Sequence, residues 1–259
     1  MTSALRRAAV FFALPITLLA IWWFASAGST DFLMPPLAKI LEVFPETWSR
    51  HRLTHDVAPS LIRLAVGFAG ALLIGIGAGV VIGSSRVVRL FAEPVLEFLR
   101  AIPPPALVPI FILVAGIDNV MKVLVIISGC VWPIVLNTVE GVRGADPVLA
   151  ETCRSYRIGE MLRLRMFVLR SASPQIVTGA RQALSIGIIL MVISEMKAAS
   201  EGLGFTIREF QTGYQFPQMW SGVLLLGLIG VVLSLLFRVA ENRVLVWYHG
   251  QRAAARVSR

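Results

Sequence analysis

Long apolar runs alternate with short polar and basic segments along this chain, and the length of each run predicts a membrane-crossing helix. About twenty apolar residues in a helix cross about 30 Å of hydrocarbon, whereas an open sheet leaves backbone groups unpaired in lipid. We therefore predict an all-α, polytopic membrane protein with about six transmembrane helices. The predicted spans are residues 10–27, 61–83, 102–117, 120–139, 176–196 and 219–240.

The span predicted at residues 102–117 is the shortest, and it opens with Pro103, Pro104 and Pro105. Prolines are tolerated in the first turn of a helix because those N–H groups have no partner within the helix. The preceding residues, 84–100, are predicted to form an inner connection with a short helix that begins after Pro94.

Composition supports membrane insertion. Apolar residues make up 56% of the chain and charged residues 15%, with a mean hydropathy of +0.77, which excludes an ordinary water-soluble globular domain. We predict one transmembrane domain over residues 1–259. It carries an external loop at residues 28–60, a cytoplasmic loop at residues 140–175 and an external segment at residues 200–218.

Charge placement predicts the orientation, because short cytoplasmic loops carry the excess of Lys and Arg. With the N-terminus inside, most arginines fall in inner segments, whereas the outer segments hold Lys39, Arg50, Arg52 and Arg208. Both termini are therefore expected in the cytoplasm. The net charge of +9 is explained by topology and by contact with membrane lipid, and we expect no nucleic-acid partner.

Three local patterns have competing interpretations. Arg6 and Arg7 precede an apolar run that ends in an A-x-A pattern, as in a secretory signal, but the run is longer than a signal core and is predicted to be a retained span. His51 and His55 have helical spacing, which suits either a zinc pair or, without a third ligand, two exposed histidines. Cys130 and Cys153 predict neither a disulfide nor a metal site.

Catalytic motifs are missing from the sequence. It contains no GxxxxGK[ST], HExxH or GxSxG, so we predict that the chain is not an enzyme and that any ATP hydrolysis occurs elsewhere. The glycines at 67, 70, 75, 77, 79 and 83 suit a moving gate or a closely packed static helix pair. Ser128, Trp132 and Asn137 place polar and aromatic groups within a span and are candidate pathway residues.

Residues 150–174 combine five arginines with apolar residues at spacings that suit an amphipathic helix. Such a helix contacts either another protein or anionic lipid headgroups.

Three strings carry a family resemblance: PSLIRLAVGF (59–68), EPVLEFLRAIPPPALVPIFILVAGI (93–117) and SEMKAASEGLGF (194–205). With them, the chain resembles the permease subunits of binding-protein-dependent ABC importers of type I, in the branch that handles sulfonates, taurine and nitrate. The resemblance implies alternating access for a small anionic solute. The expected partners are cytosolic ATP-binding subunits, an extracytoplasmic substrate-binding protein, and a second permease copy or a paralogous permease. ATP and Mg would bind the ATPase, so no cofactor is expected in this chain, and the location would be the bacterial cytoplasmic (inner) membrane.

The family's loop follows the pattern E-A-A, three residues, G, nine residues, I-x-L-P, and this chain departs from it. Glu151 and Leu169 match, but Arg157 occupies the glycine position and Gly159 lies two residues later. Since arginine tolerates a left-handed turn poorly, we expect the turn to move to Gly159 or the helix to be continuous. A different second permease would explain these departures, as would neutral drift in a homodimer. The residues expected to contact the ATPase are Glu151, Thr152, Arg154, Ser155, Arg157 and Gly159.

Arg63 and Glu195 lie near the outer ends of two spans, inside these strings. They either form an ion pair at a gate or reach the interface separately. Gly202 and Gly204 belong to the proposed external gating segment. The alternative functions are a stand-alone secondary carrier or channel, or a membrane enzyme; neither is favoured, because charged residues near the centres of the spans and clustered His, Asp or Cys are missing from the sequence.

Overall fold

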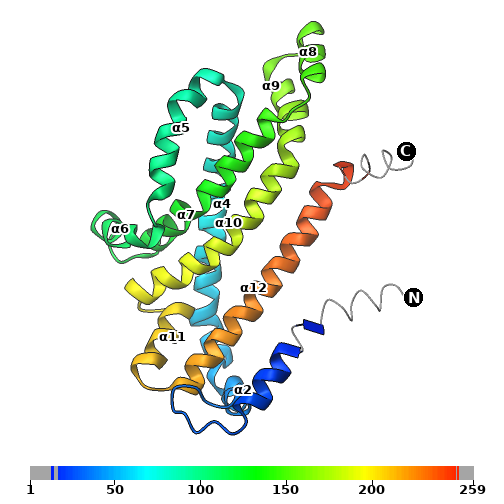
Figure 1. The fold of residues 1–259 in the computed structure, drawn as a ribbon. Helices are drawn as coiled ribbons and strands as arrows, with labels where there is room; N and C mark the ends of the chain where they lie inside the picture. The colour runs from blue at the N-terminus through cyan, green and yellow to red at the C-terminus, as the bar shows by residue number, and fades with distance from the viewer. Residues whose placement is uncertain (1–12, 15–16, 249, 251–259) are drawn as a thin grey trace, which may run out of the picture.

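The computed structural model describes residues 13–14, 17–248 and 250, and every regular element in this part of the chain is helical (Figure 1). π-helical turns occupy Leu53–Val57 and Leu164–Val168, and a 3-10 turn occupies Pro104–Leu107. The α-helices with assigned bounds are α2 (Leu37–Thr47), α3 (Arg50–Arg52), α4 (Ala58–Ser84), α5 (Arg86–Ala101), α6 (Val108–Ala115), α7 (Asn119–Arg143), α8 (Pro147–Ser155), α9 (Glu160–Arg163), α10 (Leu169–Ala198), α11 (Leu203–Thr212) and α12 (Phe216–Val244).

Four continuous helical stretches within the described residues are long and apolar enough to cross a membrane: Arg50–Ser84, Asn119–Arg143, Glu160–Ala198 and Phe216–Val244. They contain four of the six predicted spans. The span predicted at residues 10–27 lies partly outside the described residues, and its described part includes the apolar helix Thr17–Ser26.

The predicted boundary between an inner connection at residues 84–100 and a membrane span at residues 102–117 was wrong. The helix α6 has only eight residues, too few to cross a bilayer alone. Residues 86–101 form the long helix α5 rather than an inner connection, and α5 meets Pro104–Ala115 at a bend of 81°. The prolines at 103–105 separate α5 from Pro104–Ala115, because proline forces the residue before it out of the helical region. Arg100 therefore lies at the far end of α5 from Arg86.

The helix α7 forms the centre of the bundle, between α4 and α10 (Figure 1). Its residues Met121, Val125, Ile126 and Ile134 are fully buried. Small residues let the backbones approach: Gly67 of α4 faces Ile126, and Gly83 faces Val142 farther along. Because residue numbers increase in the same direction along both helices from the first contact to the second, α4 and α7 run parallel.

The α10 helix runs antiparallel to α7. Gly179 of α10 packs on the carbonyl of Pro133, and Gly141 of α7 packs on Ala172. The ends of the bundle are therefore distinct. One, which we call the α8 end, contains the end of α4, the end of α7, α8 and α9; the other, the α11 end, contains the start of α4, the start of α7 and α11 (Figure 1).

The helix α12 is attached mainly at the α11 end. Phe216, Ser221 and Gly222 are buried there, and Trp48 of the loop after α2 donates a hydrogen bond from Nε1 to Ser221 Oγ at 3.0 Å. The most apolar eighteen-residue stretch of α12 has no buried residue. Most of this helix therefore presents an apolar surface to lipid or to another protein.

Candidate functional site

A polar cluster lies at the α11 end, where apolar packing would otherwise be expected. The side chain of Arg63 is 4% exposed and that of Glu195 is fully buried. Arg63 Nη1 donates to Glu195 Oε1 at 2.8 Å, and Nη2 donates to Glu201 Oε1 at 2.7 Å. Of the two arrangements that the sequence left open, the structure therefore has the ion pair. Arg63 Nε also donates to Asn119 Oδ1 at 2.6 Å, which brings α7 into the cluster.

The remaining acceptor positions of Glu195 are also used. The backbone N–H of Gly204 donates to Oε2 at 2.9 Å, and Ser60 Oγ lies 2.7 Å from Oε1. Ser60 Oγ in turn accepts from the N–H of Leu203 at 2.9 Å. A buried carboxylate is stable only when it is paired and hydrogen-bonded in this way. Glu195 thus joins α4, α10 and the first turn of α11, where the helix dipole also favours a negative charge.

The glycines of the string SEMKAASEGLGF make room for this carboxylate. Gly202 has φ of +122°, a conformation that other residues rarely adopt, and a Cβ there would lie 2.6 Å from Glu195 Cδ. A Cβ on Gly204 would lie 2.5 Å from the carbonyl oxygen of Val192. Both positions therefore require glycine for the loop to close over Glu195.

The structure separates the predicted pathway residues from this cluster. Arg63, Glu195, Gly202 and Gly204 lie together, whereas Ser128, Trp132 and Asn137 follow α7 toward the α8 end. All three are half-buried. Ser128 Oγ donates to the carbonyl of Val125 at 2.8 Å, and Asn137 Nδ2 donates to the carbonyl of Pro133 at 2.8 Å. Asn137 also lies 3.5 Å from Gln182 Oε1 of α10.

Sequence reasoning missed three members of the cluster: Ser60, Asn119 and Glu201. Ser60 lies one helical turn before Arg63, inside the string PSLIRLAVGF, and Glu201 lies inside the string at 194–205. The position of Ser60 and Glu201 near charged residues, inside otherwise apolar strings, could have indicated that they belong to the cluster. Asn119 had no such signal, because its contact with Arg63 depends on the packing of α7 against α4. Lys122, on the next turn of α7, is also buried at 4% exposure.

The loop after α7 projects from the α8 end of the bundle (Figure 1). It begins with α8, whose N-terminus is capped by Asp146, since Asp146 Oδ1 accepts from the N–H of Val148 at 2.8 Å. All six residues predicted to contact an ATPase are exposed: Glu151, Thr152, Arg154, Ser155, Arg157 and Gly159.

Both expectations for the turn in this loop were wrong. The turn is not at Gly159, which has φ of −58°, and the helix is not continuous, because α8 ends at Ser155 and α9 begins at Glu160. Arg157 itself adopts the left-handed conformation, with φ of +49°. The N–H of Ile158 bonds to the carbonyl of Cys153 at 3.0 Å, and that of Arg157 bonds to Arg154 at 2.9 Å. This paired pattern is a Schellman motif, whose two bonds satisfy the end of α8 despite the unfavourable residue.

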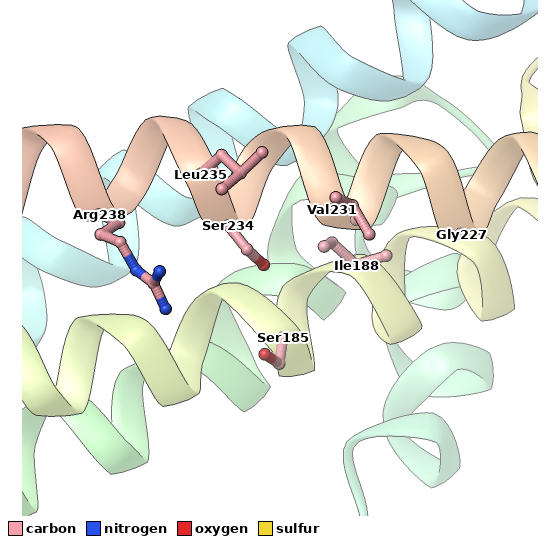
Figure 2. Close-up of a pocket in the computed structure, with 8 residues that line it drawn as sticks. Ser185, Ile188, Gly227, Val231, Ser234, Leu235 and Arg238 are labelled. Carbon is pink, nitrogen blue, oxygen red and sulfur yellow. The ribbon is translucent and has the colours of Figure 1, made fainter. Parts of the chain in front are cut away.

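A pocket of about 410 Å³ lies between α10 and α12. Figure 2 shows Ser185 of α10, with Ser234 and Arg238 of α12, beside this pocket, whose other lining residues are apolar or glycine. Toward the α8 end of the pocket, Arg181 of α10 pairs with Glu241 of α12. An ion pair thus connects the two helices beside a pocket that contains a small polar patch.

Comparison with known proteins agrees with this architecture. The model of the family described as "binding-protein-dependent transport system inner membrane component" matches residues 71–246, more than half of the chain. The taurine transport system permease protein TauC of Escherichia coli (strain K12) is 30% identical over 241 residues, covering 90% of this chain and 87% of that protein. The nitrate import permease protein NrtB of Synechocystis sp. is 26% identical over 235 residues, covering 88% and 86%.

A solved structure shows the same fold. A chain of the MetNI methionine ABC transporter in an inward-facing conformation aligns with a TM-score of 0.59 and 22% identity, over 73% of this chain and 93% of that chain. The family match and the two curated relatives, together with the membrane-length helices, identify the molecule. The chain belongs to the family of binding-protein-dependent transport system inner membrane components and is a permease subunit of an ABC transporter.

Proposed function

We propose that this permease lines the path for a small anion, delivered by an extracytoplasmic substrate-binding protein and driven by cytosolic ATPase subunits that hold ATP and Mg. The substrate class rests on the relatives named for transport of nitrate, which is an anion, and of taurine, which carries an anionic sulfonate group. The observation that carries the coupling role is the exposed, projecting α8–α9 loop. In this proposal the α8 end and both termini face the cytoplasm, and a second copy or a paralogous permease completes the path.

The α8–α9 loop suits docking because its charged residues remain available. Within the described residues, Arg154 and Arg157 have no carboxylate within 4.0 Å, and Glu151 pairs with no cation. Guanidinium groups without a carboxylate in their own chain can bind carboxylates of a partner protein through paired hydrogen bonds. The turn at Arg157 presents that side chain at the tip, so we assign it a docking contact with the ATPase.

The Glu195 cluster is the proposed outer gate. Movement of α11 away from α4 and α10 would break the hydrogen bonds from the N–H of Leu203 to Ser60 Oγ and from the N–H of Gly204 to Glu195 Oε2. Since both are buried, water or substrate must replace them when the gate opens. A binding protein on the α11 side changes the gate only if it binds the open arrangement more tightly than the closed one. Ser128, Trp132 and Asn137 are proposed to line the path farther along α7.

Reversal of charge in the loop tests the coupling. The double variant Arg154→Glu/Arg157→Glu should insert normally. Its rate of ATP-driven uptake should fall about tenfold or more, because repulsion between each new glutamate and the ATPase weakens binding by about 1 kcal/mol or more. The measurement is uptake of taurine, nitrate and bicarbonate into proteoliposomes that contain the permease, its ATPase and its binding protein, with ATPase retention on affinity resin as a second readout.

The matched control is Arg165→Glu, which reverses an exposed charge in the same loop but outside the proposed contact. Normal uptake and normal ATPase retention by the double variant would contradict the proposed coupling residues. Anion uptake by the unmodified complex that does not exceed uptake of a neutral amino acid would contradict the substrate class instead.

A further inference from the structure

A second pocket, of about 390 Å³, lies at the α8 end between the α4–α5 turn and the loop that follows α7. Among the described residues that line it none is acidic, whereas four are arginines. They come from three separate parts of the chain: the start of α5, the end of α7 and α9. These arginines are Arg86, Arg89, Arg143 and Arg163.

Most of this positive charge is not neutralised within the described chain. Arg143 pairs with Glu140 at 2.7 Å in an ion pair whose side chains are 45% and 63% exposed. Arg86, Arg89 and Arg163 have no carboxylate within 4.0 Å in the part of the chain that the structure describes. Three arginines that line one pocket without a carboxylate partner favour an anionic ligand.

An independent observation comes from Arg163. Its Nε atom is buried and has no hydrogen-bond partner among the described residues. A buried donor without an acceptor is unfavourable, so an acceptor atom supplied from the pocket would stabilise this group. Because Arg163 lines the pocket, an oxygen atom bound there would be within the reach of this side chain.

The pocket also lies at the ends of two membrane-length helices. Its walls include Gly83 and Ser84 at the end of α4, and Val142 at the end of α7, both of which are membrane-length helices. Beside the pocket, α5 exposes apolar side chains next to its arginines, with Val87 63%, Leu90 60% and Phe91 78% exposed. A charged headgroup held by arginines, with acyl chains against an apolar helix face, is the arrangement of a bound phospholipid.

We propose that this pocket binds the phosphate group of an anionic phospholipid from the cytoplasmic leaflet. The proposal rests on the orientation given above but not on the transported substrate. Free phosphate would satisfy the same guanidinium groups, but the exposed apolar residues of α5 favour the lipid. The occupant would link the α4–α5 turn to α9 through shared hydrogen bonds.

Native mass spectrometry of the permease–ATPase complex, with phosphatidylglycerol or phosphatidylcholine added to the detergent, tests this site. We expect phosphatidylglycerol to be retained at concentrations that leave no phosphatidylcholine bound. The variant Arg89→Gln/Arg163→Gln should weaken retention by about tenfold or more, because each arginine near anionic lipid contributes about 1 kcal/mol. The matched control Arg165→Gln, on the same loop but outside the pocket, should retain the lipid as the unmodified protein does.

Four results would overturn the proposal. Equal retention of the two lipids, or unchanged retention by the double variant, would exclude a specific lipid site. Stabilisation by inorganic phosphate without retention of phosphatidylglycerol would assign the pocket to a soluble anion. Loss of the ATPase from the double variant with unchanged lipid retention would make the pocket an ATPase contact. If the double variant fails to fold, Arg89→Gln alone gives the same comparison.

Discussion

At the scale of single residues, the buried Arg63–Glu195 pair differs from the ion pairs at the surface. It is surrounded by hydrogen bonds from Ser60 and from the N–H of Gly204, so loss of one member leaves a desolvated charge. The sequence placed both residues near the outer ends of spans. It could not place Asn119 beside them, because that contact follows from the packing of α7 on α4.

Arg63→Ala should lower the free energy of unfolding by about 3–5 kcal/mol, since it leaves Glu195 buried without its partner. The control is Arg100→Ala, which removes an exposed pair with Glu97 and should change stability by about 1 kcal/mol or less. Thermal unfolding in detergent, followed by tryptophan fluorescence, measures both. Equal effects of the two variants would mean that the buried cluster does not stabilise this end of the bundle.

At the scale of helices, apolar run length predicted four long helices correctly but misjudged residues 84–117. Residues 84–100 were predicted to be an inner connection with a short helix after Pro94, whereas α5 is one sixteen-residue helix that meets Pro104–Ala115 at a bend of 81°. The turn after α8 was also misjudged. Residue preference disfavours Arg157 in the left-handed conformation, but two backbone hydrogen bonds and the start of α9 fix the turn there.

Arg157→Gly separates the conformational role of this position from its charge. Glycine adopts the left-handed conformation without the cost of about 1–2 kcal/mol that other residues incur, so thermal stability should be unchanged or higher. If Arg157 also contacts the ATPase, the same variant should retain less ATPase on affinity resin. Lower thermal stability of Arg157→Gly would show that the arginine side chain, rather than the backbone, holds the turn.

At the scale of the whole molecule, α4, α7 and α10 form one closely packed unit, and α12 is attached to it mainly at the α11 end. A Cβ on Gly75 would lie 2.7 Å from Ile134, and one on Gly79 would lie 2.5 Å from Thr138. Of the two interpretations of the α4 glycines, close packing therefore describes the present arrangement at positions 67, 70, 75, 79 and 83, whereas a Cβ on Gly77 would meet nothing within 4 Å. Motion during transport is expected between this unit and its neighbours rather than within it.

A disulfide between α4 and α7 tests that expectation. A Cβ on Gly70 would lie 3.3 Å from Ile127 Cγ1, so Gly70→Cys/Ile127→Cys is placed to form a cross-link after oxidation. Uptake by the oxidised variant should stay within about twofold of uptake by the same protein after reduction. A cross-link between two helices that do not move relative to each other during transport removes no motion that transport needs. Uptake that stops on oxidation and returns on reduction would show that the two helices move past each other.

The spacing of the small residues in α4 also limits how this protein can change in evolution. Gly67, Ala71, Gly75, Gly79 and Gly83 recur every four positions and meet a parallel helix with the same period. One inserted or deleted residue in either helix would rotate every later position by about 100° around the helix axis. Larger side chains would then face the partner helix at positions where only glycine fits. Changes in length should therefore accumulate between the two helices, around residues 101–118, and not within them.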